Sequence, residues 1–344
     1  MSVAEEITRI KEAKENLKTS INAKLSDSQK KITDELISSY STFVDNIEGG
    51  GNINDYFITE GLTSSNYKLQ NLITKTPMLD VMGLTDLSHM FSGFTSLSEV
   101  PLLKNNNVTN MSYMFEGCTG LKTVSLLNTS KVTNMSGMFS NCIKLKSISE
   151  LDTSNNTTMF EMFYGCWGIN NLPLFNTSKV TDMYGAFSGC SSLESIPSFD
   201  TSNVTRMTKM LTETNITTIP LLDTSKVTST RDMFMNCSRL SSVPQLDLAN
   251  VTDATSMFSR CRSLQIVPEF NLLKVTSMGS MFGNCSMLSN NSLNNILATC
   301  ITATRISSSN KTLRYIGLTS SQATTCEGLS NYQAFLDAGW KKGY

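Results

Sequence analysis

The sequence predicts an α/β solenoid, a right-handed coil of about nine stacked units of 24 residues each. Three observations predict it: a Met-Phe dipeptide recurs at a nearly fixed spacing, each unit alternates apolar stretches with turn-forming residues, and the charge density drops where the repeat begins. The dipeptide and its equivalents begin at Met90, Met114, Met138, Met162, Ala186, Met210, Met233, Met257 and Met281. The interval between them is constant apart from a single shorter one, between Met210 and Met233.

Residues 1–48 are predicted to form a helical segment for attachment or oligomerisation. The first 51 residues hold 16 charged side chains, about 31%, whereas the other 293 hold 41, about 14%. Two apolar stripes with helical spacing run through the segment, and residues 26–29 offer a capping box. Gly49, Gly50 and Gly51 mark its end. Residues 49–84 are then expected to be a Gly-rich linker and an N-terminal cap that covers the first coil.

Each unit of the solenoid, residues 85–290, is predicted to contain a strand, a turn, a second short extended segment and a helical turn. In one unit, apolar residues over 121–127 predict the strand, Asn128-Thr129-Ser130 the turn, and alternation over 132–135 the second segment. Four apolar side chains are then spaced as on one face of a helical turn. They are Met135, Met138, Phe139 and Cys142.

Residues 291–344 depart from the repeat and are predicted to form a mixed α/β C-terminal cap. Apolar residues spaced from Leu293 to Cys300 predict an amphipathic helix, and residues 312–318 predict a strand. Thr319 and Gln322 form a capping box that opens a final helix, which Gly339 can end.

Composition limits the chemistry. With 28 basic and 29 acidic side chains the net charge is −1, so no electrostatic attraction to nucleic acid is expected. No apolar run is long enough to cross a bilayer, and the N-terminus shows no secretory signal, so synthesis in a cytoplasm without membrane insertion is expected. The single histidine, His89, occupies a variable and therefore exposed repeat position. No Ser-His or Cys-His pair can be built without this residue, and a lone surface histidine is expected to be incidental, so we expect no enzyme activity.

Two recurring columns could suggest metal sites, but a structural role is expected for both. Cys118, Cys142, Cys166, Cys190, Cys237, Cys261 and Cys285 share one repeat position and are predicted to be a buried column of small side chains. Asp152, Asp200, Asp223 and Asp247 interchange with Asn128, Asn176 and Asn271, which predicts Asx-turns rather than calcium ligands. The Met columns are predicted to be core, and neither a metal nor a cofactor is expected.

The whole unit resembles a known family. Its pattern is Leu-x-x-Ile/Val-Pro/Ser-x-Leu/Phe-Asp/Asn-Thr-Ser-x-Val-Thr-x-Met-x-x-Met-Phe-x-x-Cys. It is similar to the BspA-type leucine-rich repeat of bacterial surface proteins, which is also carried by tail-associated proteins of bacteriophages. The resemblance covers more than half of the chain, residues 85–290. It implies a leucine-rich-repeat solenoid that binds macromolecular surfaces, and it implies no reaction.

The candidate binding residues are polar side chains between the inward strand positions and a group of aromatic side chains in the fourth and fifth units. They are Phe160, Tyr164, Trp167, Tyr184, Asn170, Asn171, Lys122, Lys146 and Glu194. Exposed aromatics beside hydrogen-bonding groups suit stacking on sugars or on protein. The alternative is that the aromatics fill irregular packing where Asn156 replaces the usual Val and Ala186 the usual Met.

The function expected from these features is that of a non-enzymatic bacteriophage tail or tail-tip component, a structural virion protein assembled in the host cytoplasm. Residues 1–48 would bind other virion tail proteins, with a homotrimer as one hypothesis, and the solenoid would bind a host envelope glycan or surface protein. The alternative is a leucine-rich-repeat adhesin on a bacterial cell surface. A glycan hydrolase is the third and least favoured class.

Overall fold

The computed structural model of the chain describes residues 79–80, 84–100, 103–104, 106–124, 127–148 and 151–343. The predicted helical segment 1–48 and nearly all of the predicted linker 49–84 lie outside these residues. The described part contains nearly all of the repeat and the C-terminal segment.

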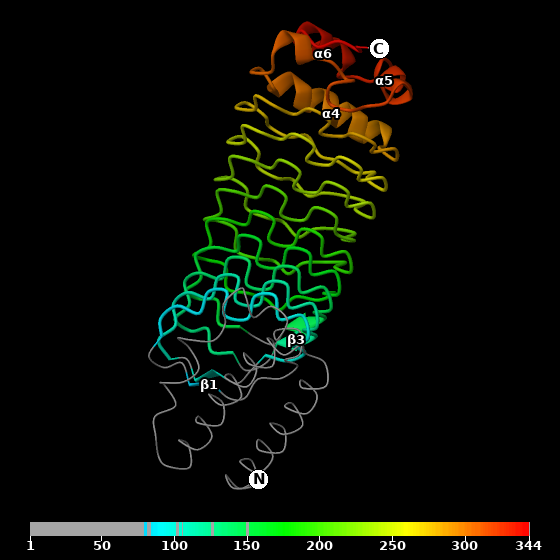
Figure 1. Ribbon diagram of the computed structural model, residues 1–344. Helices are drawn as coiled ribbons and strands as arrows, with labels where there is room; N and C mark the ends of the chain where they lie inside the picture. The colour runs from blue at the N-terminus through cyan, green and yellow to red at the C-terminus, as the bar shows by residue number, and fades with distance from the viewer. Residues whose placement is uncertain are drawn as a thin grey trace, which may run out of the picture.

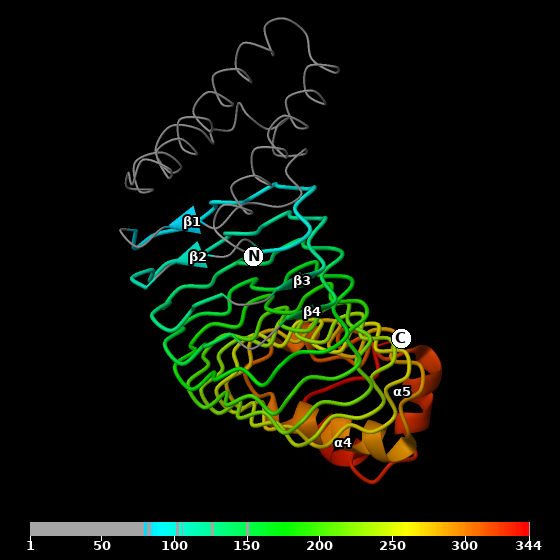
Figure 2. The ribbon, with the colours of Figure 1, turned by 90° about the horizontal axis from the view of Figure 1, so that it is seen from below.

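The described chain is a stack of similar coils with the C-terminal helices at one end (Figure 1). Viewed from below, successive coils follow a similar outline around a shared interior (Figure 2). Neighbouring coils pair in parallel, one repeat apart: β1 (Leu79–Asp80) pairs with β2 (Leu103–Lys104), and β3 (Thr123–Val124) with β4 (Ser147–Ile148). The predicted repeat solenoid is therefore present.

The strands are shorter than the sequence predicts. Among the described residues of the strand expected over 121–127, which leave out 125–126, the two residues of β3 belong to a regular ladder. The second extended segment, 132–135, contributes an isolated parallel bridge from Asn134 to Asn110. Most of the remaining coil is bent or turning chain, because each repeat must return to the start of the next coil.

The predicted helical turn is wrong, and a run of β-turns takes its place. The N–H groups of Gly137, Phe139 and Asn141 donate to carbonyl oxygens of the next coil at 2.7, 3.0 and 2.6 Å. The N–H groups between them bond within the coil, as Met138 does to the carbonyl of Met135 at 3.2 Å. Every second N–H therefore joins one coil to the next, whereas a helix would direct all of them along its own axis.

The turns need two residues per coil with a left-handed backbone. In the coil just described these are Gly137 and Asn141, with φ of 58° and 59°. A Cβ on Gly137 would lie 2.2 Å from the ring of Tyr113, which reaches over it from the preceding coil. Elsewhere the two positions hold other residues at positive φ, His89 among them, which is uncommon for residues other than glycine.

Stacked apolar columns fill the interior. The predicted Met columns are core, as Met135, Met159 and Met183 show with no more than 1% exposure. One Phe per coil stacks on the next with ring centroids 5.5 to 5.8 Å apart and nearly parallel planes. These rings belong to Phe91, Phe115, Phe139, Phe163 and Phe187. Since no single coil encloses a core, each apolar side chain is buried mainly by the coils above and below it.

Lysine and asparagine alternate along one edge of the stack. The Lys179 ammonium donates to the Asn155 amide oxygen at 2.7 Å, and the Asn155 amide nitrogen donates to the Ser130 carbonyl at 2.8 Å. The same Lys to Asn bond recurs, at 2.6 to 3.2 Å, in the pairs Lys131 to Asn107, Lys226 to Asn203 and Lys274 to Asn250. This Lys–Asn ladder repeats every second coil and uses polar groups that would otherwise face solvent unpaired.

Helix α4 (Asn290–Thr302) closes the C-terminal end of the stack, and it confirms the helix expected around Leu293 to Cys300. Three of its hydroxyl groups accept hydrogen bonds from backbone N–H groups of the last coil, each at 2.9 Å. Ser292 accepts from Val267, Thr299 from Phe270 and Thr302 from Leu272. The helix thus satisfies donors for which no further coil is available and leaves no open sheet edge at these positions.

The rest of the C-terminal segment differs partly from the prediction. Residues 312–318 do not form the predicted strand: Thr312 makes a single bridge, and a turn follows it. The Tyr315 carbonyl in this turn accepts the Ser280 N–H at 2.7 Å and so takes the place of a carbonyl of a further coil. The capping box of Thr319 is present and opens α5 (Ser320–Cys326). The final helix is interrupted, however, and α6 (Tyr332–Asp337) is separate. A short 3₁₀ helix, η3 (Ser308–Asn310), follows α4.

Asn156 shows how strictly the ladder between coils is kept. It replaces the usual Val, is fully buried, and inserts its amide between two backbone groups. Its oxygen accepts the Met135 N–H at 3.2 Å, and its nitrogen donates to the Thr158 carbonyl at 2.7 Å. In the next coil the corresponding N–H, of Met159, bonds directly to a backbone carbonyl at 2.8 Å. The side chain therefore replaces one direct bond with two.

We expect Asn156→Asp to destabilise the protein by about 3 kcal/mol at neutral pH, because a buried carboxylate loses the donor to Thr158. Burial raises the pKa of this new carboxyl above its unfolded value, so the folded state binds the proton more tightly and the penalty shrinks as pH falls toward 4. Urea unfolding of the variant and the unchanged protein at pH 5 and pH 8 measures the loss in free energy of unfolding. Asn176→Asp is the control, since Asp occupies that position in other coils, and it should be nearly neutral. An equal loss at both pH values would contradict the buried charge.

Candidate functional site

The cysteine column is buried and structural, as predicted. All seven of its thiols are free and buried, and each donates to a backbone carbonyl of the preceding coil, as Cys142 does to Phe115 at 3.0 Å. Burial raises the pKa of Cys118 and of Cys166 to about 12. Because the thiolate is the nucleophile and the metal ligand, these groups are inert at neutral pH. Among the described residues, no group of three or more His, Cys, Asp or Glu is placed to hold a metal ion.

The Asx-turns are confirmed. The Asp152 carboxylate accepts the Ser154 N–H at 3.0 Å, and Asp200 and Asp223 accept from the residue two positions later at 3.0 and 2.9 Å. These hydrogen bonds lower the pKa of all three carboxyls. Asp247, Asn128, Asn176 and Asn271 make the same bond. The carboxylates are therefore used to fix turns.

His89 is exposed, as predicted. Its ring stacks on Tyr113 with centroids 5.1 Å apart, and its Nδ1 lies 3.8 Å from a Glu116 carboxylate oxygen. This arrangement on the surface joins two neighbouring coils.

Two of the predicted aromatic residues form a closed stack. Phe160 and Tyr184 are half-buried, with ring centroids 5.1 Å apart. The Arg206 guanidinium covers the Tyr184 ring at 4.2 Å and pairs with Asp182 at 3.3 Å. Because neighbouring side chains already contact these ring faces, the packing alternative fits this pair better than a binding role.

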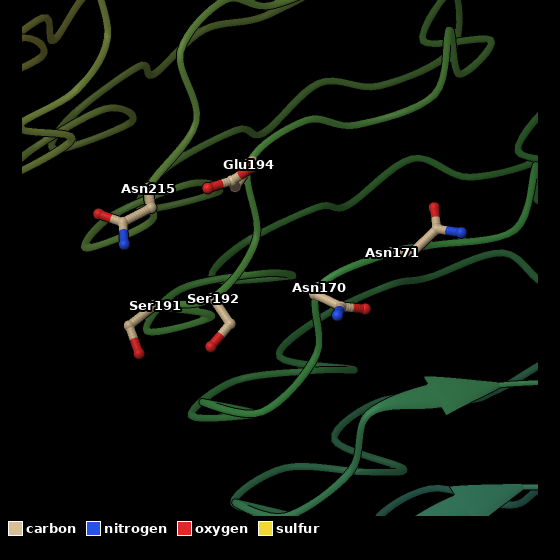
Figure 3. A pocket seen from close by; sticks show the side chains of 6 residues that line it. All are labelled: Asn170, Asn171, Ser191, Ser192, Glu194 and Asn215. Carbon is tan, nitrogen blue, oxygen red and sulfur yellow. The ribbon is translucent and has the colours of Figure 1, made fainter.

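Three other predicted residues, Asn170, Asn171 and Glu194, come together in an open surface depression of about 630 Å³ (Figure 3). Its complete lining, drawn from three successive coils, is Asn170, Asn171, Ser191, Ser192, Glu194 and Asn215. Lys122 and Lys146 precede Asn170 in the same repeat position and are exposed, but they lie outside the lining. The structure thus divides the predicted surface into a closed aromatic stack and a polar depression.

The depression lies where the repeat loses a residue. Seven units of the chain contain Cys-x-x-Leu or Cys-x-x-Ile at this turn, but residues 214–216 read Thr-Asn-Ile, one residue shorter. This deletion is the cause of the single shorter interval in the repeat. Asn215 stands alone where the preceding coil has both Ser191 and Ser192, so less chain fills the surface at this point. The irregular spacing was the signal from which Ser191, Ser192 and Asn215 could have been found.

Backbone pairing between coils is also interrupted at the depression. On this face Lys146 donates its N–H to Lys122 at 2.9 Å, and Thr217 donates to Glu194 at 3.2 Å. Among the described residues, the backbone N–H groups of Asn170 and Glu194 have no corresponding bond. The backbone ladder is therefore interrupted on both sides of the coil of Asn170, toward Lys146 and toward Glu194.

The charges around the depression are balanced. Glu194 is its only charged lining residue, and the Arg239 guanidinium lies 2.7 Å from the carboxylate. Arg239 comes from the second coil beyond Glu194, so the ion pair crosses the shortened coil. Both side chains are more than half exposed, and the pair adds little stability. The site offers hydrogen-bonding groups without a net charge.

Aromatic side chains remain accessible nearby. Trp167 and Tyr164 are 58% and 40% exposed. Trp167 occupies the repeat position of Ser191 in the preceding coil and comes three residues before Asn170, so it lies next to the depression.

The family model described as "Mycoplasma protein of unknown function, DUF285" matches residues 85–194, 168–265 and 212–305. The chain belongs to this family. Membership confirms the resemblance to the BspA-type leucine-rich repeats. No curated protein matches the chain.

Three solved structures are similar to parts of the chain. A leucine-rich repeat protein of T. pallidum is 17% identical, with a TM-score of 0.30 over 48% of this chain and 74% of that one. A leucine rich cell surface protein of Faecalibacterium prausnitzii is 18% identical, with a TM-score of 0.30 over 62% and 78%. A leucine-rich repeat protein of Eubacterium ventriosum is 16% identical, with a TM-score of 0.35 over 65% and 80%. At these TM-scores the likenesses carry no conclusion about function.

In the described part of the chain, no helix is long and apolar enough to cross a membrane.

We expect none of the nine cysteines to react quickly with a thiol reagent such as Ellman's reagent in the folded protein at pH 8. All nine are buried, and burial raises their pKa values, that of Cys326 to about 11. Unfolding in guanidinium should release all nine, which the absorbance of the product counts. Rapid modification of a column cysteine in the folded protein would contradict the buried arrangement.

Proposed function

We propose that the protein is a non-enzymatic binding protein of a bacterial cell surface, in which the solenoid contacts a neutral macromolecule. The observation that carries the proposal is the polar and nearly uncharged depression on a rigid stack of coils, with accessible aromatic side chains beside it. The polar groups supply hydrogen bonds that can orient a ligand, and the aromatic side chains supply apolar contact area.

The side chains that could perform chemistry support a role in binding. The column thiols are held protonated by burial, the turn carboxylates accept backbone N–H groups, and His89 stacks on a tyrosine. Each of these groups already has a structural task in the solenoid. A glycan hydrolase would need two carboxyl groups facing a shared cleft, whereas the depression has a single carboxylate.

The bacterial context is favoured over the virion. The family is named for proteins of Mycoplasma, a cellular organism, and nothing in the family match supports a bacteriophage tail. The tail role, attachment to other virion proteins through residues 1–48 and the homotrimer stay predictions. The proposal includes a right-handed coil of about nine units, with terminal caps over 49–84 and 291–344.

The test is binding of the purified full chain to immobilised bacterial envelope polysaccharide and to extracellular-matrix proteins. We expect saturable binding that changes less than about threefold between 50 and 300 mM NaCl, because contacts between neutral polar groups are little screened by salt. Release of reducing sugar is measured in parallel and should stay at the level of the blank. Absence of saturable binding to every surface, or hydrolysis of the polysaccharide, would contradict the proposal.

A further inference from the structure

The depression gathers polar side chains that take no part in the hydrogen-bonded columns of the solenoid. Elsewhere the Asx-turns, the Lys–Asn ladder and a column of threonine hydroxyls consume polar groups in bonds within or between coils. Within the described part of the chain, five of the six lining side chains make no hydrogen bond. They are Asn170, Asn171, Ser191, Ser192 and Asn215.

The unpaired groups form a dense and mixed set. Each Asn amide offers two donor hydrogens and an acceptor oxygen, and each Ser hydroxyl offers one donor and two acceptor sites. Within the described part of the chain the Glu194 backbone N–H is also without a backbone partner, and the Glu194 carboxylate, 2.7 Å from the Arg239 guanidinium, adds an acceptor. Figure 3 shows the two asparagines of one coil on one side and the serines and Asn215 on the other.

This chemistry selects among ligand classes. An anion would face a carboxylate and no lining cation, and a cation would find a carboxylate already paired with Arg239. An apolar ligand would find little apolar surface, because all six lining side chains are polar. A ring with neighbouring hydroxyl groups fits, since each hydroxyl both donates and accepts. The exposed indole of Trp167 beside the site offers a flat apolar surface for the C–H face of such a ring.

We infer that the depression is a binding subsite for a neutral saccharide, one hexose or N-acetylhexosamine unit of a longer glycan. The lining amides and hydroxyls bind the sugar hydroxyls, the Glu194 carboxylate accepts from one of them, and Trp167 stacks on the ring. The inference rests on the proposed function and adds the ligand class and the place where it binds.

The test is isothermal titration and a glycan array with the full chain, using neutral oligosaccharides of two to four hexose or N-acetylhexosamine units. Trp167→Ala and Asn171→Ala should each weaken binding about five- to tenfold, since a stacked aromatic and a hydrogen bond at a ligand contribute on this scale. Trp167→Phe should keep much of the affinity. Ser242→Ala is the matched control, because Ser242 holds the repeat position of Asn171 where backbone pairing is intact, and it should have no effect.

Thermal unfolding of each variant shows whether the fold is kept, and we expect all four to melt like the unchanged protein because the sites are exposed. Binding of a whole envelope surface without binding of any oligosaccharide would overturn the saccharide subsite and leave the proposed function standing. Loss of protein binding but not of sugar binding in Trp167→Ala would assign the depression to a protein partner. Oligosaccharide binding that the variants leave unchanged would place the sugar elsewhere.

Discussion

The backbone hydrogen bonds between successive coils are the constraint on which the rest of the structure depends. Every second N–H of the turn region, such as that of Phe139, donates to the coil that follows, so no coil is complete without its neighbour. The ladder favours a fixed period, because a residue inserted or lost between paired positions would shift donors against their acceptors. The one missing residue, at 214–216, falls in a turn, and Leu211 and Thr217 on either side of it still pair with the neighbouring coils. It also explains the polar residues inside the stack: Asn156 and the hydroxyls of α4 are buried where a backbone partner is replaced or missing.

Whether a surface side chain is already hydrogen-bonded within the solenoid decides whether it is available to bind a ligand. Columns of Thr, Asn, Asp and Lys side chains look like a continuous polar face in the sequence, yet many of these groups bond within their own coil or to the coil beside them. A ligand could engage such groups only by displacing bonds that hold the coils together. At the depression beside Asn215, five of the six lining side chains make no hydrogen bond within the described part of the chain, so a ligand can bind them without displacing bonds between coils. An irregularity in the repeat is therefore where function is most easily placed.

The repeat, its buried columns and the Asx-turns could be predicted from the sequence because each depends on local spacing that recurs many times. The Met and Cys columns and the capping box of Thr319 are of this kind. The prediction of a helical turn after Met135 was wrong because apolar spacing of three and four residues fits β-turns with left-handed residues as well as a helix. The prediction of a strand over 312–318 was wrong because carbonyls of this segment extend the ladder between coils through a turn. The cation–π contact of Arg206 with Tyr184 and the ion pair of Arg239 with Glu194 could not be predicted, because they are contacts between coils that no local sequence pattern encodes.

The alternation of lysine and asparagine has a consequence for how such a chain can change in length. Each Lys of the ladder donates to an Asn in the coil before it. Lys and Asn therefore occupy alternate coils, and each bonded pair spans two coils. Loss of a coil that carries an Asn would bring two ammonium groups to neighbouring positions about 5 Å apart, where they repel, and loss of a coil that carries a Lys would leave two amides side by side. A change in length by two coils keeps the order of Lys and Asn intact. The unit by which this solenoid can lengthen or shorten without disturbing the ladder is therefore the pair of coils.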